Sequence, residues 1–353
     1  FCGAGGLSEG FSRAGFKLAL ALDSDPVALR TESLNHPELP DERVLCADIR
    51  DLDSKTIRRL LGRRRIDVLA GAPPCQGFSQ AGFRARATSR RGYRVVGDER
   101  NFLFEYMLEV ALALRPPLVL LENVPGMHSA KVNDRRFLNV AARVLEEEGG
   151  YRTAIWRLNA VAFGVPQERI RYFLVAARTR AFPQEPVGDY RNYQGGDDPD
   201  ALPAIQLDEA IHDLPPLEAG GGEGVSARPP RDEASLRRRR RYLSKFGIVS
   251  DGPLVYNHVV RAHNERDLEL YALLRPGENS VDAIETHGRP DLMRYRQDAF
   301  SDKYNRLRPD APSKTIVSHL AKDGNGYIHP FQVRSISPRE GARLQSFSDE
   351  YLF

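Results

Sequence analysis

Up to about residue 180, short apolar runs alternate with segments of helical periodicity, and this alternation limits the possible fold more than any other feature. Strands separated by helices are typical of an α/β protein with a parallel sheet. The pattern predicts strands at residues 17–22, 43–46, 66–70 and 118–121, and helices at 26–34, 54–61, 101–114 and from 137 to the glycines at 149–150. Two further strands, at 151–158 and 172–177, are expected to close the sheet as an antiparallel pair.

Beyond residue 180 the alternation stops. Glycine and proline clusters, as at 195–199, 220–222 and 229–230, indicate irregular, loop-rich chain. We therefore expect two domains, an α/β domain in residues 1–183 and a smaller, loop-rich domain in residues 184–353.

Composition excludes several classes of protein. With 353 residues, of which 41% are hydrophobic and 28% charged, the chain can bury a substantial core. No stretch approaches the ~18 apolar residues of a membrane span, and no signal peptide opens the sequence. The three cysteines lack a Cys-x-x-Cys spacing, so we expect neither a disulfide framework nor a metal site, and a reducing cytoplasm as the location.

Arginine clusters suggest an anionic partner, although the net charge is only +3. Residues 84–94 contain five arginines and no acid, and residues 237–241 are five consecutive arginines. Such patches suit a polyanion, while codon bias in a GC-rich genome is the plainer explanation for arginine abundance.

Unusual residues gather where the predicted strands end. In an open parallel sheet, ligands bind beyond the carboxyl ends of the strands. That edge is expected to carry the glycine-rich residues 1–7, Asp23, Asp48, residues 72–79 and residues 122–124. The concentration of these residues at one edge predicts an active site.

The first part of this set points to a cofactor that contains a nucleoside. Gly3 and Gly5 permit a tight turn and close approach of backbone to a ligand. Asp23, about 20 residues later, is placed to bind a ribose diol, and Asp48 can accept from an adenine amino group. A plain turn and simple helix caps are the alternative interpretations. The glycine spacing departs from Gly-x-Gly-x-x-Gly, which argues against NAD.

The second part carries groups able to react. Cys75 follows two prolines just after a predicted strand, and the adjacent arginines favour a thiolate. Glu122 ends an apolar strand, where partial desolvation favours its protonated form; a structural salt bridge is the alternative. Arg169 and Arg171 are expected to point to one face of a strand, with Arg171 placed to hold an anion or a carbonyl group.

Five motifs occur in the order that is typical of the DNA (cytosine-5) methyltransferase family, and the chain resembles that family. They are Phe-x-Gly-x-Gly-Gly from residue 1, Pro-Pro-Cys-Gln from 73, Glu-Asn-Val from 122, Gln-x-Arg-x-Arg from 167 and Arg-Glu-x-x-Arg-Leu-Gln from 339. The resemblance covers residues 1–178 and about 304–353. It implies a Rossmann-like sheet that binds S-adenosylmethionine, with a smaller target-recognition domain.

The resemblance also implies a role for each matching residue. Cys75 would add to carbon 6 of cytosine, Glu122 would protonate N3, and Arg171, supported by Arg169, would hold O2. The cofactor would be bound by Phe1, Gly3, Gly5, Leu7, Asp23, Ser24, Asp48, Ile49, Pro73 and Leu103. Contacts to DNA would come from Gln76, Ser79, Arg84, Arg86, Arg90 and Arg91, in a loop expected over 77–98. The motif from 339 is expected to act as a scaffold for the recognition domain.

Two departures from the family concern the ends of the chain. The sequence begins at Phe1 and stops at Phe353, without the family's first strand and final Gly-Asn-Ala-Val-Pro motif. We therefore expect a stretch of a longer protein, and weak cofactor binding by this span alone.

The expected partner is double-stranded DNA, approached by a monomer in the cytoplasm at the nucleoid, with a cognate restriction endonuclease as a functional partner. A tRNA cytosine-5 methyltransferase and a catalytically idle DNA-binding relative are the alternatives. A nicotinamide-dependent oxidoreductase would leave Pro-Pro-Cys-Gln unexplained.

Overall fold

The computed structural model describes residues 1–73, 103–126, 131–132, 135–191, 200–228, 233, 237, 240–249, 252–294 and 303–353. The chain divides into two compact units, the first made of residues 1–158, 170–186 and 353, and the second of residues 159–169 and 187–352. The main boundary between the units thus falls after Pro186, close to the expected boundary after residue 183. The second unit also contains residues 159–169, which the sequence placed in the first domain. The assignment of target recognition to the second unit remains a prediction.

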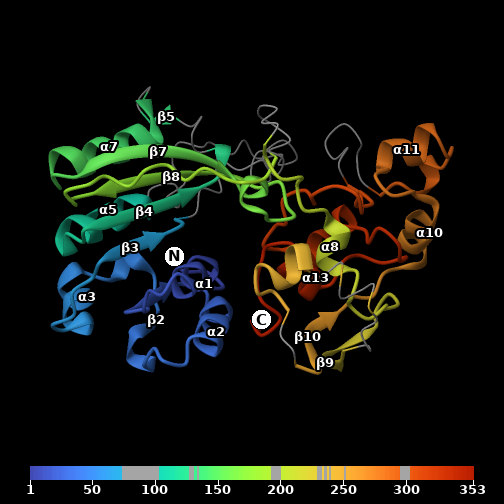
Figure 1. The fold of residues 1–353 in the computed structure, drawn as a ribbon, viewed down its shortest axis with the longest axis horizontal. Helices are drawn as coiled ribbons and strands as arrows, with labels where there is room; N and C mark the ends of the chain where they lie inside the picture. The colour runs from blue at the N-terminus through green and yellow to red at the C-terminus, as the bar shows by residue number, and fades with distance from the viewer. Residues whose placement is uncertain are drawn as a thin grey trace. The chain divides into compact units, whose positions relative to one another are not determined.

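The first unit has the α/β arrangement that the sequence predicted (Figure 1). Its strands are β1 Ala21–Asp23, β2 Val44–Cys46, β3 Val68–Gly71, β4 Leu118–Asn123, β5 Lys131–Val132, β6 Arg135–Arg136, β7 Arg152–Asn159 and β8 Ile170–Ala177. Its α-helices are α1 Gly6–Arg13, α2 Pro26–Asn35, α3 Ser54–Leu61, α5 Leu103–Leu114 and α7 Phe137–Glu147, with short 3₁₀ turns η1 Asp41–Arg43 and η2 Ile49–Asp51.

Four of these strands form one sheet, in the order β3, β4, β8, β7 (Figure 1). β3 and β4 pair in parallel, with Gly71 opposite Leu121, whereas β8 runs antiparallel to β4. β1 and β2 form a separate parallel pair. This topology, with helices between the parallel strands, confirms the predicted fold class of a methyltransferase-type α/β sheet.

Local capping explains where the helices begin and end. The Asp25 carboxylate accepts from the N–H groups of Val27 and Ala28, and Pro26 follows at the first helical position of α2. Asp53 caps α3 in the same way through Thr56. These are the N-terminal signals on which the sequence prediction of both helices depended.

The core of the first unit lies where α5 and α7 pack on β4 and β8. Phe104 and Met107 of α5, Leu138 and Leu145 of α7, and Val119 of β4 are buried together. Burial alternates along β4, so Val119, Leu121 and Asn123 share the buried face while Glu122 lies on the other. The sheet therefore fixes the direction of both polar side chains at its end.

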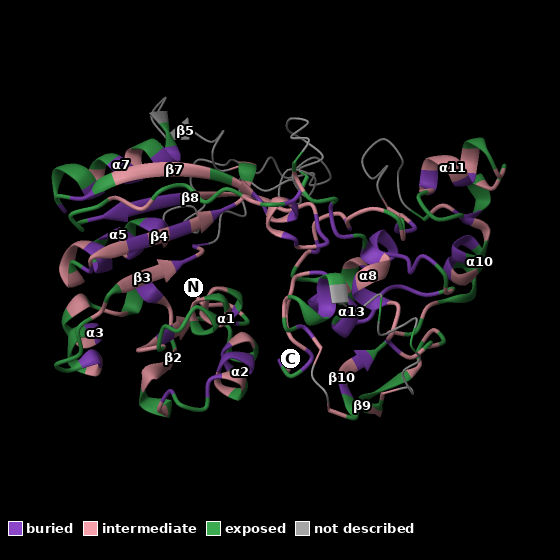
Figure 2. Ribbon diagram, in the orientation of Figure 1, coloured by how far each residue is buried: buried purple, intermediate pink, exposed green. Residues whose placement is uncertain are grey.

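The second unit is built from short elements joined by loops. Its strands are β9 Gly222–Ala227 and β10 Leu254–Val259, which pair antiparallel. Its helices are α8 Leu207–Ile211, α10 Glu265–Leu273, α11 Ser280–Glu285, α12 Leu320–Asp323 and α13 Pro338–Arg343, with short turns η5 Ala160–Phe163, η6 Arg240–Ser244, η7 Pro290–Leu292 and η8 Gly324–Gly326. α13 is almost entirely buried, as Figure 2 shows. No helix in the described ranges has the length and apolar character needed to cross a membrane.

Replacement of the α2 cap tests the local account of this fold. Asp25→Ala removes the acceptor of two backbone N–H groups and should lower the free energy of unfolding by about 1 kcal/mol. Urea denaturation followed by circular dichroism measures the change. Asp41→Ala, at an exposed acid without a side-chain capping role in η1, is the matched control, and an equal loss in both variants would contradict the account.

Candidate active site

The ends of β3 and β4 lie beside each other because the two strands pair in parallel. The Asn123 side chain closes this edge: its Nδ2 donates to the Pro73 carbonyl at 3.1 Å, and its Oδ1 accepts from the Val124 N–H at 2.8 Å. Asn123 is 5% exposed; its bond to Pro73 is buried and its bond to Val124 is partly buried. The segment that leads to Cys75 is thereby attached to the end of β4.

Glu122 faces Arg171 of the neighbouring strand β8. The Arg171 Nε lies 2.8 Å from Glu122 Oε1, and both side chains are mostly buried, at 14% and 17% exposure. Arg171 also donates to its neighbour's carbonyl at Ile170. The structure thus brings together two of the four predicted catalytic residues, in the ion pair that the sequence left as an alternative for Glu122.

Arg169 and Gln167 belong to the second unit. The Arg169 guanidinium donates to the Ile316 carbonyl at 3.3 Å. Gln167 is fully buried, donates to the Leu344 carbonyl and accepts from the Ile316 N–H, both at 3.0 Å. The sequence identified Gln167 as part of a motif but gave it no role, because two contacts about 150 or more residues away leave no local signal.

The glycine-rich turn and Asp23 form one structure. Gly3 and Gly5 have φ angles of +57° and +83°, which residues other than glycine rarely adopt. The Gly3 N–H donates to Asp23 Oδ2 at 2.8 Å, and the Asp25 N–H donates to Asp23 Oδ1 at 3.0 Å. A Cβ on Gly3 would meet no atom within 4 Å, so the turn presents open space to a ligand.

Asp48 has the capping role that the sequence left open. Its carboxylate caps η2 through the Arg50 N–H and pairs with the Arg50 guanidinium at 2.7 Å. Hydrogen bonds from the Arg50 side chain and backbone lower the pKa of Asp48. A contact with adenine stays a prediction.

Three of the apolar residues predicted to bind the cofactor, Phe1, Ile49 and Leu103, lie in one cluster. Ile49 is buried with Ile57, Leu61 and Val110, while Phe1 and Leu103 are half-buried against them. Leu7 lies half-buried in α1, Ser24 is exposed after β1, and Pro73 is buried. Cys75, Gln76, Ser79, Arg84, Arg86, Arg90 and Arg91 lie outside the described residues.

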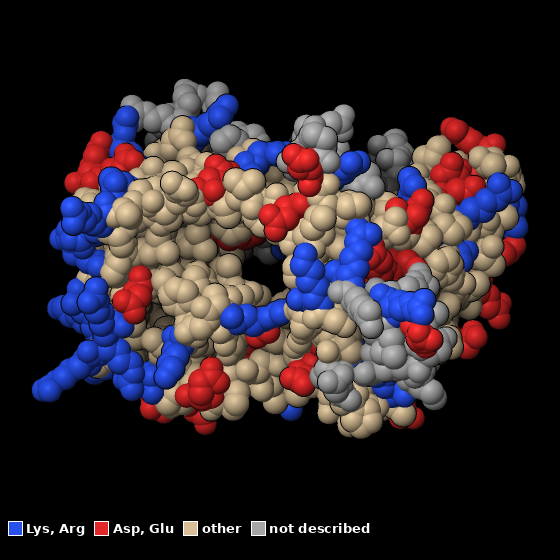
Figure 3. Space-filling view, in the orientation of Figure 1, with Lys and Arg blue, Asp and Glu red and all other residues tan. Residues whose placement is uncertain are grey.

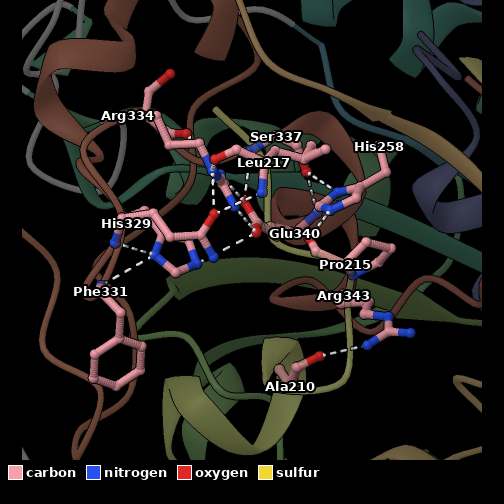
Figure 4. A network of polar contacts seen from close by, with 12 residues as sticks. Ala210, Pro215, Leu217, His258, His329, Phe331, Arg334, Ser337, Glu340 and Arg343 are labelled. Atoms are coloured by element: carbon pink, nitrogen blue, oxygen red, sulfur yellow. Dashed lines mark hydrogen bonds and ion pairs between the residues drawn. The ribbon is translucent and has the colours of Figure 1, made fainter. Parts of the chain in front are cut away.

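The Arg-Glu-x-x-Arg motif is buried in the second unit, as expected of a scaffold. Arg334 and His329 converge on the Glu340 carboxylate, and Arg334 contacts both of its oxygens at 2.7 and 2.8 Å (Figure 4). Arg339 donates to the carbonyls of Tyr256, Ser348 and Tyr351. These side chains are at most 3% exposed, so in this part of the chain they hold loops together.

A second buried cluster extends this scaffold. Arg343 contacts both Asp349 oxygens at 2.8 Å and also pairs with Asp213. Arg228 adds a second cation to Asp349 at 2.7 Å. His258 bridges Ser337 and the Pro215 carbonyl, and burial lowers its pKa. Within the described ranges, no group of His, Cys, Asp and Glu is arranged to hold a metal ion.

Comparison with known proteins identifies the family. The chain belongs to the C-5 cytosine-specific DNA methylase family, whose model matches residues 1–353. It is 31% identical to type II methyltransferase M.DdeI of Desulfomicrobium norvegicum and 32% identical to M.AgeI of Thalassovita gelatinovora. Both alignments cover 100% of this chain, with 78% and 91% of the respective relatives.

Solved structures give the same result for the fold. A protein from E. coli, assigned as a DNA modification methyltransferase encoded within a prophage, is 25% identical with a TM-score of 0.69; the match covers 100% of this chain and 88% of that one. S. pombe Dnmt2 methyltransferase, at 17% identity and a TM-score of 0.55, shares the fold over 100% of this chain and 87% of its own. The protein is a DNA (cytosine-5-)-methyltransferase that uses S-adenosylmethionine.

The first unit contains a surface that fits this cofactor. The positive-φ turn leaves open space above Gly3, and backbone N–H groups hold the Asp23 carboxylate while it keeps lone pairs for a diol. Half-buried Phe1 and Leu103 supply apolar surface for a nucleoside. The residues present therefore agree with a nucleoside-bearing sulfonium compound.

The Asn123 bridge predicts a specific loss. Asn123→Asp replaces the donor to Pro73 by an acceptor and leaves that carbonyl unpaired. We expect the rate of methyl transfer to fall by about tenfold or more, since a rise of about 1.4 kcal/mol in the activation free energy lowers a rate tenfold. The Kd for S-adenosylmethionine should stay unchanged. Single-turnover kinetics and calorimetry measure both; an unchanged rate would refute a positioning role.

The buried carboxylates predict how stability depends on pH. Burial alone raises the pKa of Glu340 and Asp349, but arginines outweigh it, holding Glu340 well below its ordinary value and Asp349 at about 2. Because unfolding restores ordinary values near 4, the stabilisation is complete above about pH 4 and is lost as the pH falls toward 2.

We therefore expect urea unfolding free energies to decline below about pH 4, and less steeply in Asp349→Asn. Asp310→Asn is the control, since its partner Arg308 is solvent-exposed and such pairs contribute little. A parent-like slope in Asp349→Asn would contradict the assignment.

Proposed function

We propose that the enzyme methylates carbon 5 of a cytosine flipped out of a specific double-stranded DNA sequence, with Cys75 as a transient covalent nucleophile. The observation that carries this proposal is the edge formed by β3 and β4. Pro73 is bonded to Asn123, and Cys75 lies only two residues later, within roughly 7 Å of chain reach. The thiol and the Glu122–Arg171 pair can therefore act on one base.

Covalent addition answers a chemical problem. Carbon 5 of an aromatic pyrimidine is a poor nucleophile, and attack of the Cys75 thiolate on carbon 6 breaks the aromaticity. The ring electrons then make carbon 5 nucleophilic. When bound, S-adenosylmethionine supplies the electrophilic methyl group. Loss of the carbon 5 proton to water and departure of Cys75 restore the ring.

Glu122 and Arg171 answer the charge that this addition creates. Negative charge develops on the pyrimidine as the thiolate adds, and a proton delivered to N3 neutralises it. The ion pair with Arg171 involves the Glu122 carboxylate, whereas protonation of N3 requires Glu122 to carry a proton. We infer that Glu122 takes up its proton as the base enters, while Arg171 turns toward O2. The family resemblance assigns Arg169 a supporting role toward Arg171.

The cofactor is assigned to the turn from Phe1 to Leu7, with Asp23 on the ribose and the residues around Ile49 beside the adenine. Asp23 supports this assignment best, because both of its oxygens are oriented by backbone N–H groups. Ser24, Asp48, Pro73 and Leu103 complete the predicted set.

A duplex shields the target carbons, so the cytosine must be extruded at a cost of a few kcal/mol. We assign this step to Gln76, Ser79, Arg84, Arg86, Arg90 and Arg91, and target recognition to the second unit. Since relatives such as M.DdeI are type II methyltransferases, we place this monomeric enzyme in a restriction-modification system of the cytoplasm, acting at the nucleoid.

Methylation of DNA in a methylation-free host, mapped at base resolution, tests the proposal. The full protein should place 5-methylcytosine at one recurrent sequence. Glu122→Gln should lower the rate by about 10²–10⁴-fold, whereas Glu109→Gln, an exposed acid of α5, should leave it unchanged. The proposal would be overturned if the enzyme methylated tRNA and left DNA unmodified, or if the two variants had equal rates.

A further inference from the structure

A basic surface lies on α3 and the turn that follows it. Six of the residues between 54 and 66 are Lys or Arg, and none is acidic. All six side chains are exposed, and Figure 3 shows blue side chains gathered over α3. We call this surface the α3 patch; it consists of Lys55, Arg58, Arg59, Arg63, Arg64 and Arg65.

Local structure explains only part of the patch. Cations in the last turn of a helix interact favourably with its dipole, which accounts for Arg58 and Arg59. Arg58 donates to the Ala113 carbonyl, Arg64 to that of Leu61, and Arg65 lies 3.7 Å from Asp67. The side chains of Arg59 and Arg63 have no hydrogen bond or ion pair to any residue that the structure describes.

The α3 patch lies just before the start of β3, whereas the proposed active site lies at the carboxyl end of that strand, beside the end of β4. The last residue of the patch, Arg65, precedes β3, whereas Pro73 and the segment to Cys75 follow it. In Figure 1 α3 is at the tail of the β3 arrow. Six residues of extended chain separate Arg65 from Gly71, roughly 20 Å. A duplex of about 10 base pairs centred on the edge formed by the ends of β3 and β4 extends only about 17 Å to either side, so it does not also reach the patch.

We propose that the α3 patch is a second, sequence-independent binding surface for the phosphate backbone of double-stranded DNA, and that it holds a distant segment of the molecule being methylated. The charge of the patch suits phosphates, which Arg59 and Arg63 can contact without breaking other interactions. Retention of a distant segment raises the local concentration of target sites. The inference requires only that the substrate is DNA, and it does not depend on the roles of Cys75 or Glu122.

The double variant Arg59→Gln/Arg63→Gln separates the two DNA surfaces. With a plasmid of several thousand base pairs, kcat/KM should fall several-fold at low salt, and the slope of log kcat/KM against log salt should become shallower by about 1–2. With a duplex of about 10 base pairs centred on one target, which extends about 17 Å to either side, both quantities should match the parent. Arg143→Gln/Arg157→Gln, at exposed arginines of the same unit, is the control and should match the parent on both substrates.

Unchanged kcat/KM on the plasmid would overturn the proposal. An equal loss on both substrates would do so too, since it would assign the patch to the main DNA site or to the fold. A measurement on the unaltered enzyme is independent of how the variant folds. Its preference for plasmid over short duplex should decrease as salt is raised, and a salt-independent preference would contradict a second electrostatic surface.

Discussion

The parallel pairing of β3 with β4 determines what this active site can do. This pairing places Pro73, which follows β3, beside the last residues of β4. The buried hydrogen bond from Asn123 to the Pro73 carbonyl holds the two strand ends together. Alternation along β4 then directs Asn123 inward and Glu122 to the opposite face, where β8 supplies Arg171. In the proposed mechanism the thiol, the acid and the cation that holds the base all depend on this sheet edge, and a shift of one residue in register would turn Glu122 away from Arg171.

The second unit is held together differently. In its described residues, the short helices and the antiparallel pair of β9 and β10 offer little continuous ladder, and buried arginines bind the carbonyls and carboxylates of its loops. Removing one partner from such a cluster leaves a charge without compensation in the interior, which is costly. The motif Arg339-Glu340 with Arg343, which the sequence predicts to be a scaffold, holds the loops together in the described structure.

The sequence predicts the first unit well because its signals are local. Apolar periodicity, Asp25 before Pro26, and Asp53 before α3 each act within a few residues, and the helices begin where these caps require. The sequence also predicts Glu122 and Arg171 as site residues; the structure pairs them, and their catalytic roles stay predictions. It does not anticipate the contacts of Gln167 with Ile316 and Leu344, or the division of residues 159–169 from their neighbours, because these depend on chain far away in sequence. The sequence analysis did not single out the α3 patch, because its position at the start of β3 is a property of the folded unit.

The most direct test of the account is covalent trapping. A duplex that carries 5-fluorocytosine at the target should accumulate a stable adduct with the complete protein and S-adenosylmethionine, because fluorine blocks loss of the substituent at carbon 5. Peptide mass spectrometry should locate the modified base on Cys75, and Cys75→Ser should form none. An adduct on another residue, or full methylation of ordinary DNA by Cys75→Ser, would contradict the central claim.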